Sequence, residues 1–318
     1  DAVAPLYRPP PNPLTKKPID TPLWTDISII DTMTTVGWGQ RLGIFAGPGV
    51  GKSTLLGMLA RFCNADVNVV ALIGERGREV PEFIRNELQA EGLERSVVVV
   101  ATGDQAPILR IRAAITATTL AEYFRSQGRR VVLFMDSLTR LAHALRETGL
   151  ASGEPPTKMG YPPSVFSMLP KILERAGNDD GKGLMTAFYT VLVDGEDLTE
   201  PVSDAARGML DGHLILSRSM AQAGRFPAID ISRSLSRSAH EIADEPHQQL
   251  AKEVRQVYSK YETNIDLIQV GMHADSKDQA LHNAIKLHPM LSDVFEQDRT
   301  RRCSLDHTIG ALKTVLGH

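Results

Sequence analysis

Residues 46–53 of this chain have the sequence Ala46-Gly47-Pro48-Gly49-Val50-Gly51-Lys52-Ser53. It follows the apolar run 42–45 and precedes a helical pattern at 54–62. Glycines let a tight loop turn its backbone N–H groups toward an anionic phosphate, while Lys52 supplies a positive charge and the Ser53 hydroxyl can ligate Mg²⁺. The amino end of the following helix adds a favourable dipole. The stretch therefore predicts a loop that binds a nucleoside triphosphate with Mg²⁺, against the alternative of a chance glycine-rich loop.

The surrounding sequence alternates apolar runs with helical patterns. The apolar runs predict strands buried on both faces of a sheet, and they are 40–46, 67–73, 97–101, 131–135 and 185–193. The helical patterns between them are 54–62, 80–91, 108–126, 138–147 and 164–176. Such alternation predicts right-handed βαβ units and a mainly parallel sheet flanked by helices, so the expected fold class is α/β.

The two ends of the chain differ from this central part. Residues 1–22 contain seven prolines and no periodic pattern, so we expect a proline-rich lead-in or linker. Residues 23–241 hold the α/β pattern, whereas apolar spacing in residues 242–318 is helical and predicts a small helical subdomain. The first residue is Asp1 and no signal-like region follows it, which predicts a fragment of a longer protein.

Composition narrows the class of function. With 318 residues, 42% of them hydrophobic, the chain can bury a large core. A net charge of −3 and only 5% aromatic residues argue against a dedicated nucleic-acid binder. Cys63 and Cys303 are far apart in sequence, which favours a reduced cytosolic protein. The nine histidines lack zinc-ligand spacing, and no segment approaches eighteen continuous apolar residues, so we expect any membrane contact to be peripheral or through partners.

Three polar features fall where predicted strands end. The phosphate loop follows the first strand, Glu75 lies just after the strand ending at residue 73, and Asp136 ends the run 131–135. The carboxyl ends of parallel strands are where ligands of open α/β sheets bind. An acid at such a strand tip can hold the water shell of Mg²⁺, although a simple strand-end cap is the alternative for Asp136.

Glu75 is the candidate for the hydrolytic step. ATP hydrolysis needs a water in line with the γ-phosphate, and a carboxylate can orient and polarise that water while Lys52 and Mg²⁺ offset the developing charge. The alternative is that Glu75 only pairs with Arg76 or Arg78 on a solvated turn.

These motifs together resemble one family over the chain from residue 18 to its end. The chain is similar to the hexameric ATPases of type III protein export, flagellar or injectisome, which are relatives of the rotary ATP synthase catalytic subunits. The motifs that carry the resemblance are Gly39-Gln40-Arg41-Leu42-Gly43-Ile44-Phe45, Ile73-Gly74-Glu75-Arg76-Gly77-Arg78-Glu79-Val80, Met135-Asp136-Ser137-Leu138-Thr139-Arg140 and Gly160-Tyr161-Pro162-Pro163-Ser164-Val165-Phe166. Ala46 stands where the general loop motif has glycine, and export ATPases resemble this chain in having Ala there.

The resemblance implies a RecA-like P-loop NTPase core with a C-terminal helical subdomain, and ATP and Mg²⁺ as ligands. Carried over, Lys52, Glu75, Arg76 and Asp136 are catalytic, and Ser53 and Asp136 lie at the metal. The residues expected to bind the nucleotide are Gly47, Pro48, Gly49, Val50, Gly51, Lys52, Ser53, Thr54 and Phe226.

Two residues of the segment 224–237 extend this site. In similar proteins the last arginine of this segment reaches the nucleotide of the neighbouring subunit, which makes Arg237 the expected trans arginine finger. A plain surface or interface ion pair is the alternative. Phe226 aligns with an aromatic that packs against adenine in the synthase relatives, while a core or interface role is nearly as well supported.

The family implies a function and partners. We expect a homohexamer that hydrolyses ATP to energise type III export, releasing and unfolding cargo from chaperones at the export gate, with stator and central-stalk proteins as further partners. The expected location is cytoplasmic, peripheral to the export apparatus at the inner membrane. In the family a β-barrel precedes the ATPase domain; its absence from this sequence leaves hexamer assembly open. The loop 178–183 could face a pore or stalk, but a solvated acidic turn is the favoured interpretation.

Two other functions stay open. A hexameric RNA or DNA motor uses the same phosphate chemistry, but it predicts a basic, aromatic-bearing nucleic-acid module that the composition disfavours. A non-catalytic nucleotide-binding subunit of a rotary ATPase should lack the acid after the second strand, whereas Glu75 is present.

Overall fold

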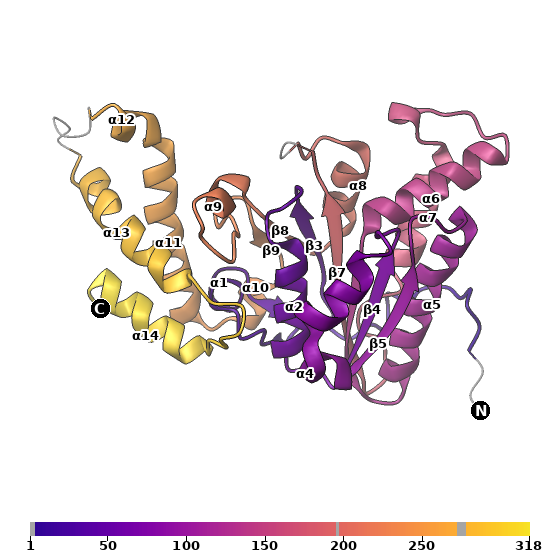
Figure 1. Cartoon of the computed structure of the whole chain (residues 1–318). Coiled ribbons are helices and arrows are strands. Elements are labelled where there is room, and N and C mark those ends of the chain that lie inside the picture. Colours follow the sequence, from indigo (N-terminus) through magenta and orange to yellow (C-terminus); the bar gives the residue numbers. More distant parts are fainter. Residues whose placement is uncertain (1–3, 195–196, 272–277) are drawn as a thin grey trace.

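The computed structural model describes residues 4–194, 197–271 and 278–318. Figure 1 shows a central sheet flanked by helices, with the carboxyl-terminal helices gathered on one side of it. The strands are β1 (Pro22–Leu23), β2 (Val36–Gly37), β3 (Arg41–Ala46), β4 (Val67–Ile73), β5 (Ser96–Ala101), β6 (Arg130–Asp136), β7 (Leu184–Leu192), β8 (Gly212–Ile215) and β9 (Leu235–Ser236). The helical segments are α1 (Ser28–Met33), α2 (Lys52–Phe62), α3 (Glu79–Glu82), η1 (Phe83–Leu88), α4 (Gln89–Glu94), α5 (Pro107–Ser126), α6 (Leu138–Ala151), η2 (Lys158–Gly160), α7 (Pro163–Leu173), α8 (Pro201–Met209), α9 (Arg218–Gln222), α10 (Ala239–Ile242), α11 (Glu245–Thr263), α12 (Ile265–Gln269), α13 (Gln279–Phe295) and α14 (Leu305–Leu316).

The main sheet has seven strands in the order β5-β4-β6-β7-β3-β8-β9. Every neighbouring pair is parallel except β8 with β9. Chain order and spatial order differ, because each parallel connection crosses over through a helix. The predicted α/β class and mainly parallel sheet are therefore confirmed. The five predicted strands correspond to β3, β4, β5, β6 and β7, and their ends differ by at most one residue.

The prediction that all five strands are buried on both faces is wrong for β5. Val97, Val98 and Val99 are half-buried, and Val100 is 39% exposed. The cause is position, because β5 is the first strand of the sheet and has a neighbour, β4, on one side only. Valine favours β-strands at the edge of a sheet as well as in its centre, so a run of valines does not distinguish the two positions.

Two hydrophobic cores lie on opposite faces of the sheet. On one face, residues such as Ile44 and Phe134 share a core with α1, α2 and the carboxyl-terminal helices. On the other face, the alternate residues Phe45 and Met135 share a core with α5, α6 and α7. This alternation follows from the period-two geometry of strands. The phosphate-loop helix α2 therefore lies on the same face as the carboxyl-terminal region (Figure 1).

The carboxyl-terminal region is helical, as its apolar spacing predicts. Helices α11, α13 and α14 pack on one another and on α1. Leu250, Val254, Leu291 and Leu312 are buried in the same core as Ile30 of α1. The helical region is thus joined to the α/β domain by a shared core.

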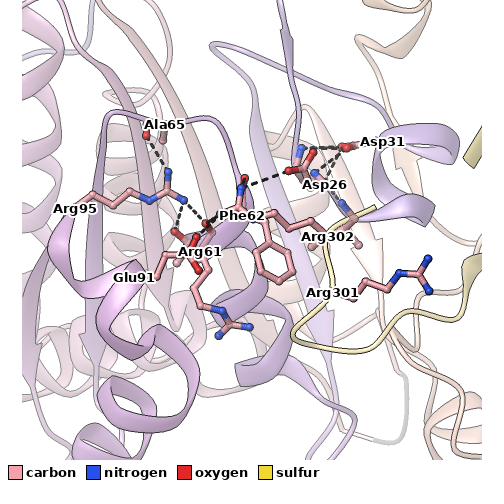
Figure 2. Close-up of polar contacts among 12 residues, drawn as sticks. Asp26, Asp31, Arg61, Phe62, Ala65, Glu91, Arg95, Arg301 and Arg302 are labelled. Atoms are coloured by element: carbon pink, nitrogen blue, oxygen red, sulfur yellow. Dashed lines mark hydrogen bonds and ion pairs between the residues drawn. The ribbon is translucent and has the colours of Figure 1, made fainter. Parts of the chain in front are cut away.

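Arginine side chains also fasten this region to the end of α2 (Figure 2). Arg302 donates to the carbonyl oxygen of Arg61 at 2.9 Å and to that of Phe62 at 3.4 Å, and it pairs with Asp26 at 3.5 Å. Arg95 donates to the Arg61 carbonyl as well, at 2.6 Å. The last carbonyls of a helix have no intrahelical donor. Arg95 and Arg302 supply donors to these carbonyls. Because Arg302 belongs to the segment before α14, its hydrogen bonds also hold that segment against the end of α2.

Residues 4–21 have no helix or strand, but they lie against the α/β domain. Arg8 pairs with Glu122 of α5 at 2.7 Å, and the Leu6 carbonyl accepts from Arg175 at 2.8 Å. Arg175 also binds Glu122, at 2.7 and 2.9 Å. Because Glu122 and Arg175 are both buried, the lead-in covers a charge cluster that would otherwise face water.

The loop 178–183 is only partly the solvated turn that its sequence predicts. Asn178 is 4% exposed; it donates to the Trp38 carbonyl at 2.9 Å and accepts from the Met185 backbone at 3.3 Å. Asp179 pairs with Arg125 at 2.9 Å. These contacts hold the chain at the entry into β7. They also satisfy polar groups that are removed from water. The solvated-turn prediction is therefore wrong for these two residues.

Candidate active site

The glycine-rich loop joins β3 to α2, as predicted. Gly49 and Gly51 have φ angles of +75° and +89°, a conformation that residues with a Cβ rarely adopt. A Cβ added at Gly49 would meet no atom within 4 Å, so the loop leaves open space in front of its backbone. Ser53, in the first turn of α2, is exposed. An open backbone cradle at a helix amino end fits a phosphate group.

The side chain of Lys52 lies between two carboxylates. Its Nζ is 2.6 Å from Asp136 Oδ1 and 3.6 Å from Glu75 Oε1. Burial lowers the Lys52 pKa, but the attraction of Asp136 and Glu75 outweighs it and holds the pKa above its usual value. The structure therefore brings together the predicted residues from the carboxyl ends of β3, β4 and β6.

Glu75 is a mostly buried acid that pairs loosely with Lys52. Its side chain is 14% exposed, and Oε1 lies 3.6 Å from the Lys52 ammonium without accepting a hydrogen bond. Burial, and next the charge of Asp136, raise the Glu75 pKa to about 7, while Lys52 opposes that shift. Arg76 instead pairs with Glu79 at 3.0 Å and is 70% exposed, so the geometry does not support a Glu75–Arg76 turn pair. A carboxylate with a pKa near neutral pH suits a general base.

Asp136 is not the cap of the helix that follows it. That cap is Ser137, whose Oγ accepts from the Arg140 backbone N–H at 3.2 Å. Asp136 Oδ1 accepts instead from Lys52 and from the Thr190 hydroxyl, each at 2.6 Å. A carboxylate and an exposed hydroxyl such as that of Ser53 are oxygen ligands of the kind that Mg²⁺ prefers.

Two residues beside the site were not singled out from sequence. Arg140 packs against the turn that carries Glu75, because a Cβ at Gly74 would lie 2.8 Å from Arg140 Cβ. Thr190 is completely buried on β7, at the Asp136 carboxylate. A signal was present for Thr190: it is a hydroxyl within the apolar run 185–193, and a buried hydroxyl needs a partner.

A cavity of about 490 Å³ opens beside the phosphate loop. Phe226 forms part of its wall, is 42% exposed, and would touch a Cβ at Gly51 at 3.3 Å. Phe226 is therefore not a core residue. The Thr54 hydroxyl donates to Glu87 at 3.3 Å, and Thr54 also lines the cavity. The segment 296–299 also lines this cavity, and the sequence does not reveal its proximity to the loop.

Arg237 lies away from the other predicted site residues. Its backbone N–H donates to Asp211 at 3.0 Å, next to Gly212, which pairs with Leu42 near the start of β3. The phosphate loop begins after Ala46, about 13 Å farther along the strand at about 3.3 Å per residue. Arg237 is exposed and lines a groove of about 890 Å³. It faces outward, at the end of the sheet opposite its own phosphate loop.

Fold and site together define a P-loop nucleoside triphosphatase with a RecA-like core and a carboxyl-terminal helical region. Comparison with known proteins then gives the family. Residues 26–236 match the model of the ATP synthase alpha/beta family, nucleotide-binding domain, and residues 243–314 match that of the T3SS EscN ATPase C-terminal domain. The chain belongs to the ATP synthase alpha/beta family, and it is an ATP-hydrolysing enzyme.

Relatives of two kinds resemble the chain over most of its length. The flagellum-specific ATP synthase of Bacillus subtilis strain 168 is 49% identical over 309 residues, which are 97% of this chain and 70% of that protein. The type 3 secretion system ATPase of Xanthomonas euvesicatoria is 48% identical over 99% of this chain and 71% of its own length. The structure of the assembled ATPase EscN from enteropathogenic E. coli has a TM-score of 0.93 at 45% identity, over 99% of this chain and 78% of EscN. The predicted resemblance is confirmed.

Proposed function

We propose that this chain hydrolyses ATP with Mg²⁺ at a site completed by a second copy, and that the energy drives type III protein export. The observation that carries the proposal is the convergence of Lys52, Glu75 and Asp136 at one edge of the sheet. Relatives named flagellum-specific ATP synthase and type 3 secretion system ATPase support the export function.

The phosphate loop holds the triphosphate, and Lys52 moves from the two acids to the phosphate oxygens. Ser53 and Asp136 would hold the metal. Bound Mg²⁺ supplies positive charge that offsets the developing negative charge of phosphoryl transfer. Movement of Lys52 removes a cation from Glu75, which keeps the pKa of this acid high enough to accept a proton from water. Glu75 Oε1, buried and without a hydrogen-bond partner, is the atom that orients this water.

Arg237 contributes to the neighbouring copy. Its exposure and its place at the far end of the sheet mean that it cannot serve its own loop, whereas a head-to-tail ring puts this face against the next copy. A permanently charged planar guanidinium suits a transferring phosphoryl group. Arg76, exposed beside Glu75, is proposed as a second arginine at the same interface. Phe226 and the cavity beside the loop would take the adenine base.

The assembly and partners follow from the relatives. EscN is described as an assembled ATPase and in complex with its central stalk EscO, which supports a homohexamer and a stalk partner here. Stator proteins, chaperone–cargo complexes and the export gate are proposed as further partners, with the ATPase on the cytoplasmic side of the inner membrane. Within the described residues no helix has the length and apolar character needed to cross a membrane.

ATP turnover measured with and without RNA separates this proposal from the two alternatives. We expect Mg²⁺-dependent turnover that RNA does not change. Stimulation by RNA would indicate a nucleic-acid motor, and nucleotide binding without turnover in a verified oligomer would indicate a non-catalytic subunit. Either result would contradict the proposal.

A further inference from the structure

A threonine hydroxyl lies inside the sheet, within the otherwise largely apolar strand β7. Thr190 is 0% exposed on β7, a central strand between β6 and β3. Burying a hydroxyl without a hydrogen bond destabilises a protein. Thr190 avoids this cost by donating to Asp136 Oδ1 at 2.6 Å. The buried hydroxyl is therefore satisfied by the acid.

The strand register holds Thr190 level with Asp136. Met135 pairs with Tyr189, one residue before both, and on the other side Thr190 pairs with Ile44, two residues before the loop. Backbone pairing on both sides of β7 fixes the position of the Thr190 Cα, and β-branching restricts its χ1 angle. The hydroxyl is a rigid donor between the strand of the loop and the strand of the acid.

Lys52 is the other donor to the same oxygen, and it is mobile by comparison. Its ammonium is carried on a four-carbon stem, and the loop chemistry requires it at the phosphates when nucleotide binds. Asp136 then loses a 2.6 Å partner. Thr190 Oγ1 still holds Oδ1, restrains rotation of the carboxylate and leaves Oδ2 for a hydrated metal.

We propose that Thr190 is a positioning residue that keeps the Asp136 carboxylate oriented toward Mg²⁺ after Lys52 has moved to the phosphate. The proposal rests on the proposed function, because it assigns Thr190 to the same site. Outer hydrogen bonds of this kind typically change metal affinity or activity by about 10–100-fold when they are removed.

Thr190→Val and Thr190→Ser separate the hydroxyl from the methyl group. Valine keeps the shape and loses the donor, whereas serine keeps the donor and loses a methyl group. The readout is the affinity of a fluorescent, non-hydrolysable ATP analogue in Mg²⁺ and in EDTA, together with the Tm and the kcat and KM of ATP turnover. Thr186→Val is the matched control, because Thr186 lies on the same face of β7 and donates to the Gly37 carbonyl at 3.0 Å, away from the loop.

For Thr190→Val we expect unchanged affinity in EDTA, a loss of about 10–100-fold in the Mg²⁺ enhancement and a fall in kcat. Thr190→Ser should remain near wild type, and Thr186→Val should lower the Tm without changing the Mg²⁺ enhancement. A Thr190→Val protein with normal Mg²⁺ enhancement, or a Thr190→Ser protein more impaired than Thr190→Val, would overturn the proposal. If the wild-type chain itself showed neither Mg²⁺ enhancement nor turnover, both the proposed function and the role of Thr190 would be contradicted.

Discussion

Lys52 Nζ lies 2.6 Å from Asp136 Oδ1, and this contact joins the first residue of α2, the helix that follows β3, to the end of β6, although β7 lies between β3 and β6 in the sheet. The same ammonium is 3.6 Å from Glu75. One cation therefore compensates two acids at the strand ends. We therefore expect that binding of an anionic phosphate at Lys52 would redistribute this charge and would be linked to protonation at the site.

Lys52→Met should destabilise the chain in a pH-dependent way. Without the ammonium, Glu75 still feels the repulsion of Asp136 but loses the attraction of Lys52, so the already raised Glu75 pKa rises further in the folded state. The folded protein then binds more protons than the unfolded one, so stability falls as pH rises from about 5 toward 8. Thermal unfolding between pH 5 and 8 checks this, and the decline should be steeper than in wild type. Equal pH dependence of the two proteins would show that Lys52 does not compensate these acids.

Glu75→Gln should separate binding from chemistry. The amide keeps the size of the side chain but cannot accept a proton, and loss of a general base costs about 10²–10⁴-fold in rate. We expect nucleotide affinity near wild type and turnover reduced by that factor. Glu79→Gln is the matched control, since Glu79 pairs with Arg76 on the same turn and should leave substantial turnover. Full activity of the Glu75→Gln variant would contradict the role of Glu75 as the general base.

The pH profile of kcat/KM should show an acid limb with a midpoint at about 7, the value to which burial first and Asp136 second raise the Glu75 pKa. The protonated acid cannot accept a proton from water, so kcat/KM rises as pH increases through the midpoint. Glu79 also raises this pKa, and Glu79→Gln should therefore move the midpoint to lower pH. A midpoint that stays in place would exclude Glu75 as the titrating group.

The meeting of Lys52, Glu75 and Asp136 at one edge of the sheet could be predicted from sequence, because local motifs specify it. Each motif follows an apolar run, and in a parallel sheet the ends of such runs meet at one edge. Glu75 and Asp136 thus come together without knowledge of strand order. The edge position of β5 could not be predicted in this way, because four valines in a row have the same β-propensity at an edge and in the centre.

Contacts between segments that are distant in the chain could not be predicted from the sequence. The segment 296–299 reaches the phosphate loop only because the carboxyl-terminal helices pack on α1, and no local pattern encodes that docking. Thr190 was missed for a related reason, since its partner depends on the order of β6 and β7. The short strand β9, which places Arg237 at the far end of the sheet, has only two residues and carries no periodic signal.

Arg61→Met should weaken the joint between α2 and the carboxyl-terminal segment (Figure 2). The Arg61 guanidinium is buried and donates to the Glu87 carbonyl and, at 2.6 Å, to the Arg299 carbonyl. Leaving such carbonyls unsatisfied costs about 1–3 kcal/mol each when they stay buried. Denaturant unfolding should show a loss of this size. Arg301→Met, on an exposed side chain of the same segment, should stay within about 0.5 kcal/mol of wild type; equal losses in the two variants would contradict this role.

In the proposed ring, each active site combines Glu75 of one copy with Arg237 of the next. Arg237→Ala alone should leave the fold and nucleotide binding intact, because the side chain is exposed and far from its own loop, and it should abolish turnover. Glu75→Gln alone should also be inactive. Neither change therefore identifies a shared site when tested by itself.

The most direct measurement is ATP turnover of rings assembled from an equal mixture of Glu75→Gln and Arg237→Ala chains, with mixed oligomers verified by native mass spectrometry. In a head-to-tail ring with random order, about a quarter of the interfaces join an intact Glu75 to an intact Arg237. We predict partial recovery of turnover, in proportion to that fraction. Verified mixed rings that remain as inactive as either parent would contradict a site shared between copies.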